Sequence, residues 1–262
     1  MVHEMGSRLR FVARHEAFGL APALASAIRV WQLALYDPQQ LFAPGDRVWL
    51  DSADAGPAIL DTASAERLNR ETIEQIEALV DPGEAWPPEL PPCGVELVAE
   101  PDCANMRGLG AAMKRHLRAL AAASGMREVL VAPLVRMSVL NPQNRHPPVA
   151  RAMARLRDEG FDTTGGLVAI GPVEVVADLL GSLFWVARCN ASAPQLFIGA
   201  PGSDWSAQLC RYANLHFTPC GERDALAVLL RRSGFVLPPD GQCSERFSRR
   251  AAVAGRRLEL GP

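Results

Sequence analysis

The segment from Asp81 to Gly94 constrains the fold of this chain more than any other. It contains five prolines, and each proline fixes φ and removes a backbone hydrogen-bond donor. Neither a helix nor a central strand can pass through such a segment, so we expect a linker or a crossover here. The sequence therefore predicts an acidic portion at 1–94 that ends in this Pro-rich linker, an α/β portion at 95–240 and an Arg-rich tail at 241–262.

Charge is divided unevenly between the two sides of residue 94. Residues 1–94 hold 14 acidic residues and seven arginines, whereas residues 95–262 hold 15 acidic and 20 basic residues. The two parts have net charges of −7 and +5, although the whole chain has −2. This asymmetry is explained by two portions that attract each other, or by a basic portion that binds an acidic partner.

The N-terminal portion shows the pattern strand, helix, strand, strand, helix, strand. The predicted strands are 8–14, 47–51, 58–61 and 95–99, and the predicted helices are 20–36 and 62–80. A turn-rich loop at 52–57 favours an antiparallel hairpin between the second and third strands. This order matches a ferredoxin-like βαββαβ unit, a topological match that carries no function.

The C-terminal portion predicts a mixed, partly parallel α/β sheet, so the fold class is α/β (mixed α+β). Predicted strands are 128–135, 166–170, 195–200 and 215–218, and predicted helices are 106–123, 148–159, 172–180, 205–212 and 223–233. Residues 182–188 either continue a helix past Gly181 or form a strand. We favour a strand, joined as a hairpin to the strand at 195–200.

The strand followed by Gly199, Gly202, Ser203 and Asp204 is the first candidate site. A turn from a strand into a helix exposes backbone N–H groups that can hold a phosphate or a carboxylate. These residues lack the third glycine of a dinucleotide fingerprint, and the acidic Asp204 would repel an anion. The favoured interpretation is that Ser203 caps the helix and Asp204 complements its dipole.

The loop that contains Asn144, Arg145 and His146 is the second candidate site. Its amide, guanidinium and imidazole groups follow a predicted strand, and loops beyond strand ends are where α/β folds bind ligands. The alternative is a solvated loop whose prolines stop a strand and start a helix. Together with the preceding turn, this loop predicts a site for an anionic small molecule.

Six cysteines stand at positions 93, 103, 189, 210, 220 and 243, and none forms a Cys-x-x-Cys pair. Cys210, His216 and Cys220 could converge on a metal, but a helix end followed by a strand would point them in different directions. We therefore favour small buried apolar thiols and predict no metal site. Motifs for a serine nucleophile, a zinc-protease helix or a phosphate-binding loop are absent, so no catalytic residue or cofactor is predicted.

These observations favour a cytoplasmic bacterial protein that binds another protein as an accessory, adaptor or immunity-type inhibitor. Arginine dominates the basic residues, with Lys114 the single lysine, and arginine is favoured at interfaces. The alternative is an enzyme or binding domain for an anionic ligand at Gly199–Asp204. No apolar run reaches the ~18–20 residues of a membrane span, and the N-terminus lacks a secretory-signal pattern. A pI near 6.2 argues against a protein dedicated to binding nucleic acid.

Overall fold

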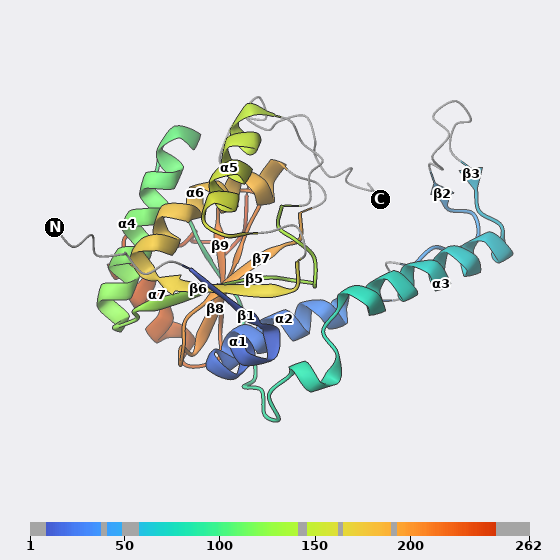
Figure 1. The fold of residues 1–262 in the computed structure, drawn as a ribbon, viewed down its shortest axis with the longest axis horizontal. Helices are drawn as coiled ribbons and strands as arrows, with labels where there is room; N and C mark the ends of the chain where they lie inside the picture. Colours follow the sequence, from blue (N-terminus) through green and yellow to red (C-terminus); the bar gives the residue numbers. More distant parts are fainter. Residues whose placement is uncertain are drawn as a thin grey trace. The chain divides into compact units, whose positions relative to one another are not determined.

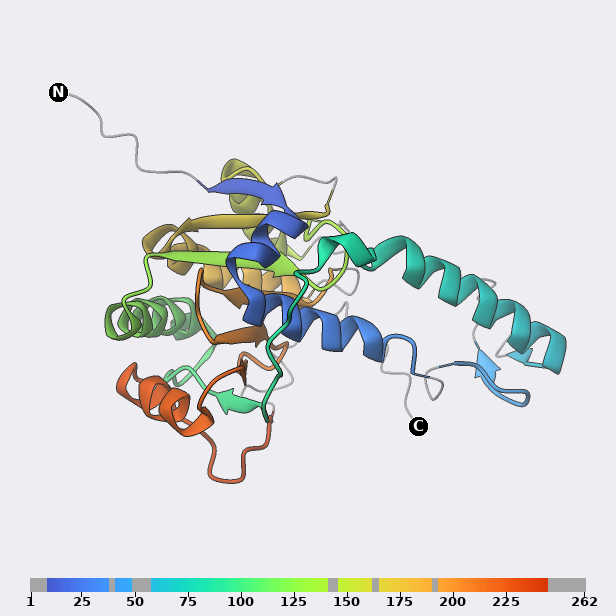
Figure 2. The ribbon, with the colours of Figure 1, turned by 90° about the horizontal axis from the view of Figure 1, so that it is seen from below.

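The larger of two sheets in the computed structural model has seven strands, and the structure describes residues 9–37, 41–48, 58–140, 146–161, 165–189 and 193–244. The strand order is β1-β6-β5-β7-β8-β9-β4, and each neighbouring pair is antiparallel. Figure 2 shows this order from β1 (blue) to β4 (green). The strands are β1 (Arg10–Ala13), β4 (Leu97–Ala99), β5 (Glu128–Pro133), β6 (Leu167–Pro172), β7 (Leu196–Gly199), β8 (Trp205–Leu209) and β9 (Leu215–Pro219).

Seven helices and a separate two-stranded hairpin complete the described elements. The helices are α1 (Arg14–Leu20), α2 (Pro22–Ala34), α3 (Thr62–Leu79), α4 (Met106–Ser124), α5 (Pro147–Asp158), α6 (Val173–Cys189) and α7 (Arg223–Arg232). A short 3₁₀ turn, η2, spans Gly83–Ala85, and the hairpin joins β2 (Arg47–Val48) to β3 (Ala58–Ile59). The mixed α/β class and the predicted hairpin are therefore confirmed.

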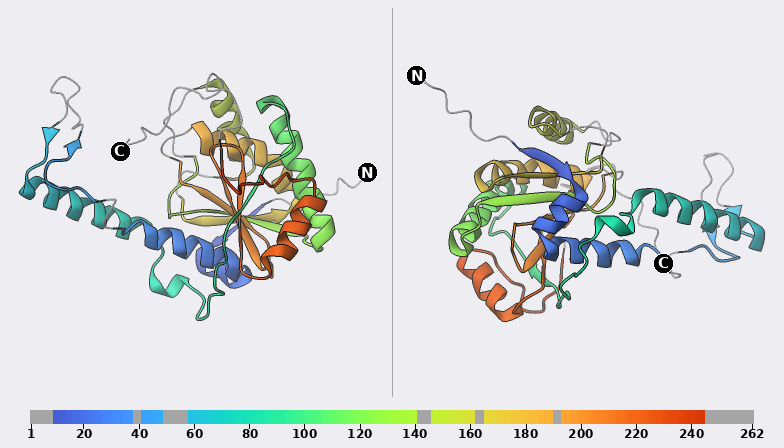
Figure 3. Two further views of the ribbon diagram at one scale, coloured as in Figure 1. Left: turned by 180° about the vertical axis from the view of Figure 1, so that it is seen from behind. Right: turned by 60° about the horizontal axis from the view of Figure 1, so that its bottom comes forward.

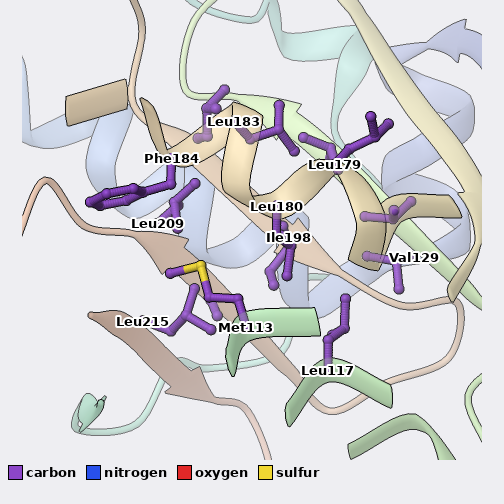
Figure 4. Packing of buried hydrophobic residues seen from close by; sticks show 14 of the residues in the cluster. Met113, Leu117, Val129, Leu179, Leu180, Leu183, Phe184, Ile198, Leu209 and Leu215 are labelled. Carbon is purple, nitrogen blue, oxygen red and sulfur yellow. The ribbon is translucent and has the colours of Figure 1, made fainter. Parts of the chain in front are cut away.

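Both faces of the sheet are buried. In β5, Val129 and Val131 join the large cluster formed with α4, α5, α6 and α7, while Leu130 is fully buried outside that cluster. On the second face, α2 approaches β7 so closely that a Cβ added to Gly199 would lie 3.1 Å from the Cβ of Leu24. Figure 3 shows α7 beside α4, and Figure 4 shows side chains of α4 and α6 meeting those of the strands.

The predicted parallel pairing is wrong. Strands buried on both faces have continuous apolar runs, and such runs are typical of parallel sheets. In this protein α1 and the start of α2 cover the second face of the sheet. The strands of this antiparallel sheet are therefore also continuous apolar runs. The ferredoxin-like arrangement is not observed either, because β1 pairs with β6, β4 pairs with β9, and β2 and β3 form their own sheet.

Residues 182–188 belong to helix α6, so the predicted strand is wrong there. Gly181 does not end the helix; it allows a close approach to α4, since a Cβ added to Gly181 would lie 3.3 Å from the Cα of Gly110. Apolar positions continue at helical spacing through Leu183 and Phe184, both buried. Packing against a second helix therefore overrides the helix-breaking tendency of an isolated glycine.

The Pro-rich segment forms no regular element except η2, as its prolines predict. It is anchored at its start by a buried ion pair, in which Arg14 donates to both carboxylate oxygens of Asp81 at 2.5 and 2.7 Å. Arg14 also donates to the carbonyl of Pro133 at 2.7 Å. The segment is thus tied to the end of β5 through the guanidinium group of Arg14.

The chain divides into two compact units, residues 1–28 with 81–262, and residues 29–80. The second unit contains the β2–β3 hairpin and α3, whose N-cap Asp61 accepts a hydrogen bond from the N–H of Ser64 at 2.7 Å. The division at residues 94 and 240 stays a prediction, and residues 245–262 of the Arg-rich tail lie outside the described residues. Among the described helices, none has the length and apolarity needed to cross a membrane.

Candidate functional site

Three side chains with metal-ligating atoms meet at the end of the sheet where β8 turns into β9. We call Cys210, His216 and Cys243 the Cys–His cluster; their ligand atoms all lie within 4.8 Å of one another. The Sγ atoms of Cys210 and Cys243 are 3.6 Å apart, and His216 Nε2 lies 3.1 Å from Cys243 Sγ. Soft thiol and imidazole groups therefore converge on one point.

A tight turn between β8 and β9 positions the first of these groups. The N–H of Cys210 donates to the carbonyl of Asn214 at 2.9 Å, and the N–H of Ala213 donates to the carbonyl of Cys210 at 3.0 Å. Ala213 has a φ of 70°, a left-handed conformation that non-glycine residues rarely adopt. The closed turn holds the Cys210 thiol next to the start of β9.

Sheet register places Glu96 behind His216. Val98 of β4 lies opposite His216 of β9, and Glu96 directly precedes β4, two residues before Val98, where an extended chain returns to the same face. The Glu96 carboxylate oxygen Oε1 lies 2.6 Å from His216 Nδ1. A carboxylate on Nδ1 leaves Nε2, the nitrogen beside Cys243, as the free ligand atom.

Asn214 supplies a buried amide to the same cluster. Asn214 is 0% exposed, and its Nδ2 donates to Cys243 Sγ at 3.3 Å and to the carbonyl of Ser244 at 3.4 Å. Its Oδ1 has no hydrogen-bond partner among the described residues. A buried amide oxygen without a hydrogen-bond donor costs free energy. A further polar group that donated a hydrogen bond to Oδ1 would therefore be favourable here.

The Cys210 thiol is largely shielded from water. Burial raises the pKa of Cys210 to about 12, and the neighbouring Cys243 adds to this effect. The N–H of Tyr212 points at Cys210 Sγ from 3.3 Å and partly offsets it. Without a cation, Cys210 is therefore a neutral thiol at neutral pH, and a bound metal would displace its proton.

The geometry of the cluster fits a tetrahedral metal ion. Two thiolates that are each about 2.3 Å from zinc at a tetrahedral angle lie about 3.8 Å apart, close to the 3.6 Å between Cys210 and Cys243. A histidine ligand whose second ring nitrogen meets a carboxylate is the usual arrangement at zinc sites. Within the described residues the cluster provides three ligands, which leaves a fourth position for water or another group.

Sequence reasoning considered Cys210 and His216 together with Cys220 but predicted no metal site, whereas the structure brings Cys243, and not Cys220, beside the other two. The predicted helix at 205–212 is wrong: Trp205–Leu209 is strand β8, so Cys210 and His216 flank a hairpin turn and converge. The Cys220 thiol instead forms a hydrogen bond with Cys93, which lowers the pKa of Cys93 to about 7. No local spacing pointed to Cys243, which comes from the segment after α7.

The predicted anion site at Gly199–Asp204 is in a turn between two strands, not between a strand and a helix. The N–H of Gly202 donates to the carbonyl of Leu20, and the N–H of Ser203 donates to the carbonyl of Ala200. The Ser203 hydroxyl also lies 2.9 Å from the carbonyl oxygens of both Ala200 and Trp205, either of which can accept its single O–H. The helix N-terminus that motivated this site is absent, and ligand binding there stays a prediction.

The second predicted site falls only partly within the described residues. Asn144 and Arg145 lie outside them, whereas His146 immediately precedes α5. The ring of His146 lies 6.4 Å from that of Trp185 on α6, measured between centroids. His146 is therefore near the helical layer and not beside the Cys–His cluster.

Comparison of this chain with protein-family models, with curated proteins and with solved structures gave no match.

Proposed function

We propose that this protein binds a transition-metal ion, with Zn²⁺ as the best fit, through Cys210, His216 and Cys243. The observation that carries this proposal is the pair of thiols 3.6 Å apart next to an imidazole whose Nδ1 contacts Glu96. Thiolate and imidazole ligands select zinc, copper(I) or iron over magnesium or calcium. Tetrahedral spacing and the absence of a methionine sulfur among the three ligands favour zinc.

The metal would join parts of the chain that are distant in sequence. Cys210 and His216 belong to the β8–β9 hairpin, and Cys243 belongs to the C-terminal segment. A bound ion would therefore fix residues near 243 against the end of the sheet, and its binding free energy would add to the stability of the fold. The fourth coordination position would be free for water or an external ligand.

Metal analysis of the purified full chain tests this proposal. We expect about one zinc per chain, retained through dialysis against a weak chelator, and loss of that zinc in Cys210→Ser and Cys243→Ser. Cys103→Ser removes a half-buried thiol outside the cluster and is the matched control. A cobalt(II)-substituted protein should show the visible absorption of a tetrahedral thiolate site. Metal-free protein that takes up neither zinc nor cobalt would reject the proposal.

A second candidate function, binding of another protein, is supported by the unit at residues 29–80. Val30, Leu33 and Ile59 are apolar side chains with 55%, 62% and 68% exposure. The unit carries nine acidic and four basic residues, a net charge of −5. Exposed apolar groups within an acidic surface fit a partner protein with a basic rim around an apolar patch.

A pull-down with the full chain, at low and at moderate salt, tests this second function. We expect a retained partner to be lost with Leu33→Glu, because a carboxylate would be buried in the apolar contact. Glu74→Gln on the exposed surface of α3 is the control for a small change in charge. A partner that binds wild type and Leu33→Glu equally would exclude this surface as its docking site.

A further inference from the structure

A groove of about 570 Å³ lies over α6, between α4 and α5. Figure 1 shows α6 between the other two helices, and α6 packs directly against both. Small residues form the floor of the groove: Gly110 and Ala111 of α4, and Ala177, Gly181 and Ser182 of α6. The groove exists because these positions lack the bulk that normally fills the space between helices.

Three cationic side chains line this groove, and one acidic side chain opposes them. Lys114 of α4 forms an ion pair with Asp178 of α6, which neutralises both. Arg107 of α4 and Arg155 of α5 also line the groove, and neither has an ion-pair partner among the described residues. Two guanidinium groups from different helices thus leave the groove with an excess of positive charge.

Aromatic side chains from α6 complete the lining. Phe184 is fully buried and supports Trp185, which lines the groove and is only partly buried. The ring centroids of these two residues are 6.5 Å apart, and His146 approaches Trp185 from the start of α5. A planar ring can pack on the indole while its anionic group meets the arginines.

We propose that this groove binds a phosphorylated small molecule with a planar ring, such as a mononucleotide. A guanidinium group donates two parallel hydrogen bonds to a phosphate, and Arg107 and Arg155 provide two such groups. The volume lies within the range of small-molecule sites. This binding site is separate from the Cys–His cluster and does not depend on a metal.

Calorimetric titration of the full chain with AMP, adenosine and inorganic phosphate tests the proposal. We expect AMP to bind more tightly than either part alone, and Arg155→Gln to weaken AMP binding by about tenfold or more. Arg157→Gln, an exposed arginine on the same helix that does not line the groove, should leave the affinity unchanged.

Trp185→Leu separates the two halves of the ligand. It should weaken AMP binding and leave the affinity for inorganic phosphate unchanged, because only the ring contact is removed. Circular dichroism of each variant shows that it is folded, and Cys243→Ser should bind AMP as wild type does. Absence of AMP binding, or equal AMP affinity in wild type and Arg155→Gln, would overturn the proposal.

Discussion

His116 and His216 both pack against the sheet or its flanking helices, yet their rings meet different kinds of partner. His116 Nε2 accepts a hydrogen bond from the N–H of Asp102 at 3.1 Å, and its Nδ1 lies 2.9 Å from the carbonyl of Ser233. His216 meets the carboxylate of Glu96 and the thiol of Cys243. Hydrogen bonds with backbone groups hold His116 in one neutral tautomer. The partners of His216 are ionisable side chains, and such groups can release a proton when a cation binds.

The difference shows how a histidine that holds the fold together can be distinguished from one that could do chemistry. The contacts of His116 use both ring nitrogens and leave no ligand atom, and the residue is only 5% exposed. At His216, one nitrogen is oriented by a carboxylate and the other points at a thiol.

Replacement of either histidine by alanine should give the largest contrast. We expect His216→Ala to weaken zinc binding by more than about 100-fold, because it removes one of three ligands. His116→Ala should keep the wild-type metal content, since it lies outside the cluster. The zinc content of each variant is measured per chain after dialysis. Equal loss of zinc in the two variants would contradict the assignment of His216 as a metal ligand.

Glu96→Gln probes the orientation of His216 without removing a ligand. The carboxylate oxygen of Glu96 lies 2.6 Å from Nδ1 of His216, and a neutral amide oxygen would be a weaker hydrogen-bond acceptor at that position. We expect zinc affinity to fall by about 10–100-fold, the usual effect of losing such a partner. Competition with a fluorescent zinc indicator measures this change. Glu100→Gln, four residues further along the same segment at a backbone bridge to Val236, is the control.

His116→Gln should lower stability while leaving the metal site intact. One amide cannot reproduce both of the contacts of the imidazole with Asp102 and Ser233. The free energy of unfolding should therefore fall by about 1–2 kcal/mol, the cost of a buried polar group that loses its partner. Urea unfolding followed by circular dichroism measures it, and an unchanged midpoint would show that the contacts with His116 are not stabilising.

The smallest expected effect is in the pH dependence of stability. Burial lowers the pKa of His116 below its ordinary value of 6.5, so the unfolded chain takes up a proton at a higher pH than the folded chain does. Stability that depends on neutral His116 is therefore present above about pH 6.5 and is lost as the pH falls below it.

Urea unfolding at pH 7.5 and pH 5.5 measures this term. Wild type should lose more stability over the interval than His116→Gln. His15→Gln, at an exposed position, should behave as wild type does. Parallel losses in wild type and His116→Gln would contradict a role for His116 in the acid sensitivity of the fold.

Local patterns were sufficient where one element buries one face. The amphipathic helix from Thr62 and the helix ending before Gly234 were predicted within a few residues, because capping and period-3.6 spacing are local. The pattern failed at Trp205–Leu209, where a 205, 209, 212 spacing fits a helix but 205, 207, 209 fits a strand equally well. Burial of Ser206 hides the alternation that would have decided it.

The candidate metal site could be predicted only in part for the same reason. Cys210 and His216 are six residues apart, but a predicted helix end between them led to the prediction of no metal site, and Cys243 is 27 residues beyond His216. The carboxylate of Glu96 is 120 residues from His216 in the sequence. No local spacing encodes contacts of this length, because they arise from the pairing of β4 with β9 and from the return of the C-terminal segment.

The sequence by itself determined that residues 81–94 interrupt regular structure, that most helices lie where amphipathic periods occur, and that the chain contains one lysine and six cysteines. Tertiary structure alone decided the antiparallel strand order, the continuation of α6 through Gly181, and the meeting of Cys243 with His216. The physical reason is that proline, caps and helical periodicity act on neighbouring residues. Strand pairing and close helix packing are settled by burial of surfaces that are distant along the chain.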